Sequence, residues 1–288
     1  MDLTIEKLHD DFGARIHDIN LKTISSDNFF EQINAAIDQY SFLHFPQQSL
    51  NDKRHLDLTK ILGQPEPNHV KFGQQGVIDY FFTIGNVQDD GTVLSNKHQN
   101  TIFQTGNNMW HSDSSFREIP SFVTMMYAYE VPIKGGQTNF VSCRSAYARL
   151  PETTKLTINN LTVIHDYVFS RSKISSDAVT KSHATSLPAV RQKLVRNNLN
   201  IDKKNYYIGS HAKSIVGWNF QDSRILLDDL LQVATQKNHI YSHTWKPGDF
   251  VIWDNRCLLH RGVGYNADKY RRKMRQTRVQ GLQSTLKE

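Results

Sequence analysis

The fold is decided by the stretch Phe250-Val251-Ile252-Trp253-Asp254-Asn255-Arg256-Cys257-Leu258-Leu259-His260-Arg261-Gly262. Its four consecutive apolar residues, 250–253, are typical of a buried strand, and the polar residues after them predict a tight turn that holds His260. Similar short runs, bounded by proline or glycine signals, predict strands at 122–127, 138–141 and 206–208. Strands therefore dominate the second half of the chain.

Helices are predicted around these strands. Shorter strand patterns come earlier, at 14–19, 42–45 and 80–84, and helical periodicity predicts helices over about 27–40, 51–62, 142–150, 151–161 and 221–237. The most economical arrangement is a mainly β fold with surrounding helices, built as a two-sheet jelly roll. We expect a single domain over residues 1–288.

Two polar stretches interrupt the pattern. Residues 86–108 are rich in Asn, Gln, Asp and Gly with little apolar periodicity, which is typical of a mobile active-site loop or lid. Residues 168–200 are equally polar and fit a long excursion better than a domain boundary. We therefore expect loop or lid insertions at about 64–108 and 168–200.

Composition excludes several classes of protein. The 288 residues, 38% of them hydrophobic, can bury a packed core, so a disordered or fibrous chain is excluded. The apolar runs fall far short of the roughly 20 residues that a membrane helix needs. The N-terminal sequence fits neither a secretory signal nor a transit peptide, so we expect a cytoplasmic protein. The two cysteines, Cys143 and Cys257, exclude a disulfide framework and a thiolate zinc site.

The net charge of +6 is concentrated in only one segment, Lys269-Tyr270-Arg271-Arg272-Lys273-Met274-Arg275, followed by Arg278. No interleaved aromatic platform accompanies it, so a nucleic-acid partner is not expected. Two interpretations stay open: a solvated strand face, or a site for an anionic small molecule.

Two histidines and one carboxylate are the candidate metal ligands. His111 and Asp113 lie two residues apart, so in an extended segment both side chains point to the same face. An H-x-D pair or a single histidine such as His260 is unremarkable alone. Together, His111, Asp113 and His260 have the composition of the facial triad that binds non-haem Fe(II) and leaves coordination positions open for a chelating co-substrate and O2.

Several stretches resemble the TauD/TfdA family of Fe(II)/2-oxoglutarate-dependent dioxygenases, in particular the branch with the 2,4-dichlorophenoxyacetate dioxygenases. They are Phe12-Gly13-Ala14, Ile84-Gly85-Asn86-Val87, Trp110-His111-Ser112-Asp113-Ser114-Ser115-Phe116, Gly135-Gly136-Gln137-Thr138, Trp253-Asp254-Asn255-Arg256 through His260-Arg261, and Arg271-Arg272-Lys273-Met274-Arg275-Gln276-Thr277. The resemblance covers nearly the whole chain. It implies a double-stranded β-helix (jelly roll, cupin-like), iron bound by His111, Asp113 and His260, and 2-oxoglutarate and O2 as co-substrates.

The resemblance also implies that a threonine and an arginine hold the far carboxylate of 2-oxoglutarate. Thr138 matches the threonine, and either Arg271 or Arg272 matches the arginine. If Arg272 faces inward, then Met274, Gln276 and Arg278 share its face, while Arg271, Lys273, Arg275 and Thr277 face water. The other register would bury Lys273 without a partner, which is costly, so Arg272 is favoured.

Substrate contacts are the point at which the chain departs from the family. Many relatives carry a second arginine four residues further on, where the favoured register gives Gln276 and places Arg275 beside it. Asn107 matches a family position near the substrate, and a turn residue is the alternative interpretation.

The resemblance therefore implies an oxygenase that releases succinate and CO2 and oxidises a C–H bond by hydroxylation, cyclisation or desaturation. The substrate is expected to be a small, carboxylate-bearing molecule. Two alternatives remain: a zinc-type hydrolase with the same ligands, and a non-catalytic jelly roll that binds a metal or ligand. The sequence leaves the oligomeric state open, a homo-oligomer included.

Overall fold

The computed structural model describes residues 3–68, 79–174 and 185–288. The strands are β1 (Thr4–Lys7), β2 (Ala14–His17), β3 (Phe42–Phe45), β4 (Phe82–Gly85), β5 (Ser121–Glu130), β6 (Thr138–Ser142), β7 (Thr162–His165), β8 (Val190–Lys193), β9 (Val195–Asn198), β10 (Lys203–Tyr206), β11 (Ala212–Ile215), β12 (Tyr241–His243), β13 (Phe250–Asp254), β14 (Leu258–Gly262) and β15 (Lys273–Gln280). The helices are α1 (Ser26–Tyr40), α2 (Asp52–Leu62), α3 (Gln99–Gln104), α4 (Cys143–Arg149), α5 (Glu152–Ile158), α6 (Tyr167–Ser172), α8 (Phe220–Ala234), and the 3-10 turns η2 (Thr105–Asn108), η3 (Lys237–His239) and η4 (Thr285–Lys287).

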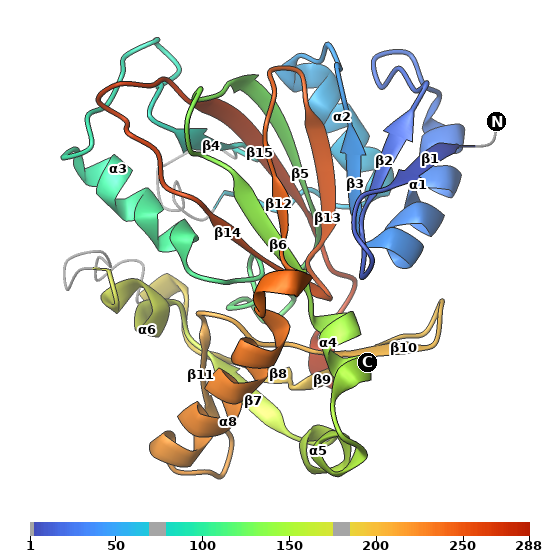
Figure 1. Ribbon diagram of the computed structural model, residues 1–288, viewed down its shortest axis with the longest axis vertical. Helices are drawn as coiled ribbons and strands as arrows, with labels where there is room; N and C mark the ends of the chain where they lie inside the picture. Colours follow the sequence, from blue (N-terminus) through green and yellow to red (C-terminus); the bar gives the residue numbers. More distant parts are fainter. Residues whose placement is uncertain (1–2, 69–78, 175–184) are drawn as a thin grey trace.

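The protein is a mixed α/β structure, with about 30% helix and about 29% strand, and not the mainly β protein that the sequence predicted. Much of the helix lies in the segments that flank the strands, where short amphipathic helices cover the sheets (Figure 1). Among the described residues, no helix is both long enough and apolar enough to cross a membrane.

A seven-stranded sheet is the largest element, with the order β1-β2-β3-β13-β5-β15-β4. The order brings together strands that are far apart in the chain, because β13 lies between β3 and β5, and β15 lies between β5 and β4. The decisive stretch 250–254 is therefore a central strand. All five of its side chains are buried, as its continuous apolar pattern predicts.

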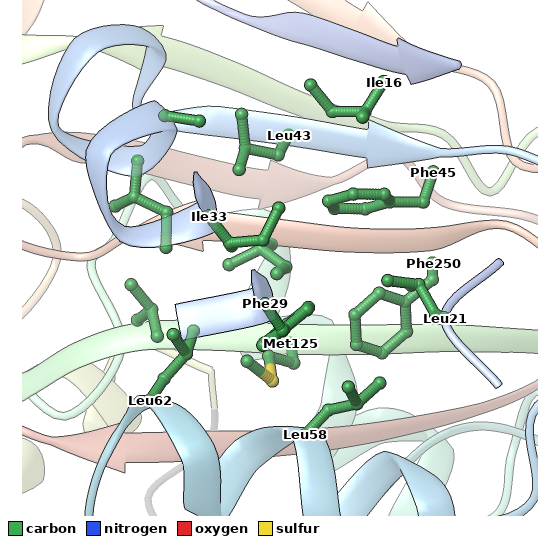
Figure 2. Packing of buried hydrophobic residues seen from close by; sticks show 14 of the residues in the cluster. Ile16, Leu21, Phe29, Ile33, Leu43, Phe45, Leu58, Leu62, Met125 and Phe250 are labelled. Atoms are coloured by element: carbon green, nitrogen blue, oxygen red, sulfur yellow. The ribbon is translucent and has the colours of Figure 1, made fainter. Parts of the chain in front are cut away.

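Helices α1 and α2 cover the outer face of this sheet. Ser25 caps α1 by accepting a hydrogen bond from the backbone N–H of Asn28, and Asn51 caps α2 in the same way through Arg54. Figure 2 shows the resulting core, in which helix residues pack on sheet residues. Its labelled members include Phe29, Ile33, Leu58, Phe45, Met125 and Phe250.

The inner face packs against a three-stranded sheet with the order β12-β6-β14. Side chains from both sheets share one buried cluster, in which Phe42, Met126 and Trp253 meet Phe140 and Leu258. The polar ends of β14 and β15 lie beside this cluster, and this placement brings His260 and Arg272 toward the same space.

A third core lies below the two sheets in Figure 1, where α4 and α8 pack around β7, β9, β10 and β11. The two stretches expected to be loops carry more regular structure than their polarity suggested. Residues 86–108 contain α3 and η2, and residues 168–200 contain most of α6 together with β8 and β9. Residues 69–78 and 175–184 of the two expected insertions lie outside the described residues. That the chain is a single domain stays a prediction.

The burial pattern of β15 matches the register in which Arg272, Met274, Gln276 and Arg278 face inward. Thr277, which was expected to face water, is fully buried under α2. Its hydroxyl lies 2.7 Å from Thr59 Oγ1 and 3.0 Å from His55 Nε2. The expectation failed because a helix covers the outer face of the strand at this point.

Acid should destabilise this helix–sheet contact. Burial lowers the pKa of His55 to about 3, so the folded protein holds this imidazole neutral while an unfolded chain protonates it near pH 6.5. The stability from neutral His55 is complete above pH 6.5 and is lost as the pH falls toward 3, by at most about 1.4 kcal/mol per pH unit. Urea unfolding at pH 6.5 to 4 should show a shallower decline for His55→Gln than for the unaltered protein. Equal slopes would contradict this assignment.

Candidate metal and co-substrate site

A pocket opens at the end of the two facing sheets, against α3 and η2. His111, Asp113 and His260 line its floor. Residues of β4, β15 and the segment after β14 line its walls, among them Ile84, Gly262, Tyr265, Arg272, Gln276 and Arg278. The expected lid residues 86–108 contribute Asn96, Thr101, Gln104, Thr105, Asn107 and Asn108 to the same pocket.

The backbone places the two histidines opposite each other. His111 N–H donates to His260 O at 3.0 Å, and His260 N–H donates to His111 O at 2.8 Å, so the two residues form an isolated antiparallel bridge. Their ring centroids are 4.2 Å apart. Asp113, two residues along, has its carboxylate 3.9 Å from His111 Nε2 and 3.7 Å from His260 Nε2. The structure thus brings the three predicted ligands into one cluster.

Asp113 is held as a carboxylate. Arg278 Nη2 donates to Oδ1 at 2.9 Å, while Thr124 Oγ1 and Gln276 Nε2 donate to Oδ2 at 2.7 and 3.1 Å. Burial alone would raise the pKa of Asp113, but the Arg278 guanidinium holds the pKa well below its usual range. The carboxyl is therefore ionised and oriented.

The proton positions of His111 suit a metal ligand. Its Nδ1 lies 2.8 Å from the carbonyl oxygen of Met109, which can only accept, so Nδ1 carries the proton and Nε2 presents a lone pair to the cluster. Burial lowers the pKa of both His111 and His260, that of His260 to about 3, which keeps the imidazoles neutral. Two neutral imidazoles and one carboxylate fit Fe(II).

A second group of similar composition, His44, His243 and Asp249, lies buried between β3 and β12. Here the protons are placed differently. Arg15 Nε faces His44 Nδ1 at 3.4 Å, so Nδ1 accepts and His44 Nε2 carries the proton that it donates to Asp249 Oδ1 at 3.0 Å. This nitrogen has no lone pair for a metal, and the group is a hydrogen-bonded network.

Arg272 and Thr138 meet at the pocket wall. The Arg272 side chain is buried, with Nη1 donating to Gly136 O at 2.8 Å and Nε lying 3.1 Å from Met274 Sδ. Thr138 Oγ1 accepts a hydrogen bond from Trp245 Nε1 at 2.9 Å, so its hydroxyl proton can point to another acceptor. Arg271, in contrast, is exposed and paired with Glu130.

The candidate substrate residues fall on different sides of β15. Gln276 lines the pocket, with its amide on Asp113, and Asn107 lines the pocket as well. Arg275 lies outside the pocket, on the other face of the strand, where it pairs with Asp89 at 2.9 Å and Asp52 at 3.3 Å.

Several residues around the site were not singled out from the sequence. Arg278, recognised only as sharing the face of Arg272, binds Asp113 and lies 3.8 Å from Glu66. Thr124 and Asn255 support the carboxylate from β5 and the turn after β13. The period of two along β15 contains the signal for Arg278, whereas Glu66 sits between two prolines in an expected loop and has no local signal.

Comparison with known proteins agrees with this geometry. The family model for taurine catabolism dioxygenase TauD, TfdA family, matches residues 4–278. This chain belongs to the TauD/TfdA family. The expected enzyme class, an α-ketoglutarate (2-oxoglutarate)-dependent dioxygenase, is confirmed, and the zinc hydrolase and the non-catalytic jelly roll are not supported.

Individual relatives extend over nearly the full length of this TauD/TfdA chain. It is 32% identical to the alpha-ketoglutarate-dependent 2,4-dichlorophenoxyacetate dioxygenase of Burkholderia sp. (strain RASC), covering 99% of this chain and 97% of that protein. It is 29% identical to the (S)-phenoxypropionate/alpha-ketoglutarate-dioxygenase of Sphingobium herbicidovorans, covering 90% of this chain and 89% of that protein. The crystal structure of AAD-2 in complex with Mn(II) and N-oxalylglycine matches with a TM-score of 0.89 and 31% identity over 99% of each chain.

Metal titration tests the choice between the two clusters. Mn(II) should bind one ion per chain, and His111→Gln should weaken this binding by roughly 100-fold or more because a ligand is lost. His44→Gln is the matched control and should retain binding, measured by calorimetry on variants whose folding is checked by circular dichroism. Retained binding in His111→Gln together with loss in His44→Gln would reverse the assignment.

Proposed function

We propose that this protein is an Fe(II)- and 2-oxoglutarate-dependent oxygenase that oxidises a C–H bond of a small, carboxylate-bearing molecule and releases succinate and CO2. The reaction is a hydroxylation, or an oxidative cyclisation or desaturation. His111, Asp113 and His260 are the proposed iron ligands. The two facing sheets are the proposed double-stranded β-helix of the family.

The observation that carries the proposal is a buried arginine without an acidic partner in the same pocket as the ligand cluster. Among the described residues, no carboxylate forms an ion pair with Arg272. Burial lowers the pKa of this guanidinium to about 10, which still leaves it charged at neutral pH. A buried charge of this kind is costly unless an anion compensates it.

The far carboxylate of 2-oxoglutarate supplies that anion in our proposal. A guanidinium binds a carboxylate through two parallel hydrogen bonds, and the Thr138 hydroxyl can donate a third. The N-oxalylglycine bound to AAD-2 has the same length and the same two end groups as 2-oxoglutarate, which supports this placement. The keto-acid end then faces the iron ligands.

Bound Fe(II) would supply the activation of O2 that is coupled to oxidative decarboxylation of the co-substrate. The protein's own residues orient the ligand side chains and exclude water from them. Arg278 and Thr124 fix the Asp113 carboxylate, the backbone bridge fixes the two imidazoles, and Trp253 and Phe140 pack beside His260 and keep water from its ring. The proposed co-substrate therefore meets a preorganised site.

The substrate class rests on two kinds of support. The relatives named above act on phenoxyacetate- and phenoxypropionate-type acids, as their names state. The pocket itself combines apolar walls from Ile84, Met126 and Tyr265 with buried arginines, a combination that suits a small acid with an apolar body.

Succinate formation is the direct test. With Fe(II), ascorbate, air and 2-oxoglutarate, the protein should form succinate above the background of His111→Gln, and one member of a panel of small carboxylic acids should stimulate the rate. Iron content and folding are checked in parallel. Iron-loaded, folded protein that forms no succinate would exclude the proposed activity.

Neighbouring arginines provide a matched pair of variants. Arg272→Gln should raise the 2-oxoglutarate KM by about 10- to 100-fold, because a buried charge-assisted contact is lost. Arg271→Gln, which removes an exposed surface charge, should leave this KM unchanged. If only Arg271→Gln raised the KM, the co-substrate would be bound by the other arginine.

A further inference from the structure

Among the described residues, Arg171 is a second buried arginine without an acidic partner. It lies on α6, exposes 9% of its surface, and is not part of the proposed iron or 2-oxoglutarate contacts. Its hydrogen-bond partners are uncharged groups: Nη1 donates to Phe103 O at 3.3 Å, Nη2 donates to Asn107 Oδ1 at 3.4 Å, and the Tyr167 side chain is a third partner. Its Nε has no hydrogen-bond partner among the described residues.

The surroundings of Arg171 explain why the charge is tolerated but not neutralised. Its guanidinium carbon lies 4.8 Å from the ring centroid of Phe103 and 5.5 Å from that of Tyr167, so two aromatic faces supply partial compensation. The acidic residue at the start of α6, Asp166, caps the helix through Phe169 N–H and pairs with Lys213 at 2.9 Å. It is therefore committed elsewhere.

The position of Arg171 points to the pocket. Asn107, its hydrogen-bond partner, lines the pocket four residues before His111. Glycine at position 106 permits this approach, because a Cβ there would lie 2.1 Å from Arg171 Nη1.

The other buried arginines near the pocket are already accounted for. Arg278 is neutralised by Asp113 and lies near Glu66, and Arg272 is the proposed partner of 2-oxoglutarate. Arg275 pairs with two aspartates outside the pocket, and Gln276 carries no charge. Among the buried arginines of the described residues, Arg171 is the one left without an anion.

We propose that Arg171 supplies the positive charge that recognises the carboxylate of the primary substrate, acting through Asn107. The Asn107 Oδ1 atom accepts from Arg171, so the amide Nδ2 points away from Arg171 and can donate to a substrate carboxylate in the pocket. Asn107 contacts the substrate, and Arg171 is the positioning residue that orients the amide and provides the charge. This proposal rests on the proposed oxygenase function and adds to it the residue that selects an acid.

The experiment compares acids with their neutral amides. Phenoxyacetate, phenylacetate, hexanoate and N-acetylglycine, each paired with its primary amide, are tested for stimulation of succinate formation and for calorimetric binding to the Mn(II)- and 2-oxoglutarate-loaded protein. Arg171→Gln should raise the KM or Kd of the preferred acid by about 10- to 100-fold and change that of its amide little. Arg171→Lys, which keeps the charge, should recover part of the affinity.

Two measurements separate this role from a structural one. These are the affinity of Arg171→Gln for the neutral amide and its KM for 2-oxoglutarate: a distorted pocket would worsen both, whereas loss of acid recognition would worsen only the affinity for the acid. Arg191→Gln, which removes an exposed arginine of β8, is the control and should change neither. Equal losses for acid and amide in Arg171→Gln would overturn the proposal.

The two proposals fail in different ways. If unaltered, iron-loaded protein does not decarboxylate 2-oxoglutarate at all, the oxygenase function itself is wrong. If it decarboxylates 2-oxoglutarate but binds none of the four acids better than their amides, the oxygenase function stands and the role of Arg171 in selecting an acid is wrong.

Discussion

The pair of backbone hydrogen bonds between His111 and His260 is the constraint on which the site depends. It joins the residues after η2 to β14, two segments that are 149 positions apart in the chain, and it fixes both imidazoles to one piece of backbone. Asp113 then reaches the same point because it is two residues along an extended segment. The cluster is therefore held by main-chain geometry, and the side chains around it only refine its orientation and charge.

Charge balance organises the rest of the pocket. Among the described residues, three arginines are buried within it or against it, and of these only Arg278 has an internal carboxylate partner. Burying a guanidinium without a partner anion destabilises the folded protein, and binding of an anion offsets this cost. With Arg272 in the pocket wall and Arg171 behind Asn107, the site is suited to hold two anions at once, as the proposed co-substrate and a carboxylate substrate would require.

The sequence predicted the parts of the site that depend on local spacing. The H-x-D pattern placed His111 and Asp113 on one face, and alternation along 271–278 selected Arg272 over Arg271 by the cost of burying Lys273. It did not predict what depends on packing between distant segments. Thr277 is buried because α2 crosses its strand, and α3 forms within a polar stretch with weak periodicity. Arg171 is buried on a short helix in what was expected to be a long polar excursion.

Gln276 shows why the charge for the substrate should come from outside the sheet. Its amide lies 3.1 Å from the Asp113 carboxylate, which already accepts a hydrogen bond from Arg278 on the same strand face. A neutral amide at this position orients Asp113 and brings no charge of its own to bind a substrate carboxylate. With the strand position neutral, the positive charge for an acidic substrate has to come from another element, and Arg171 behind Asn107 is the proposed source.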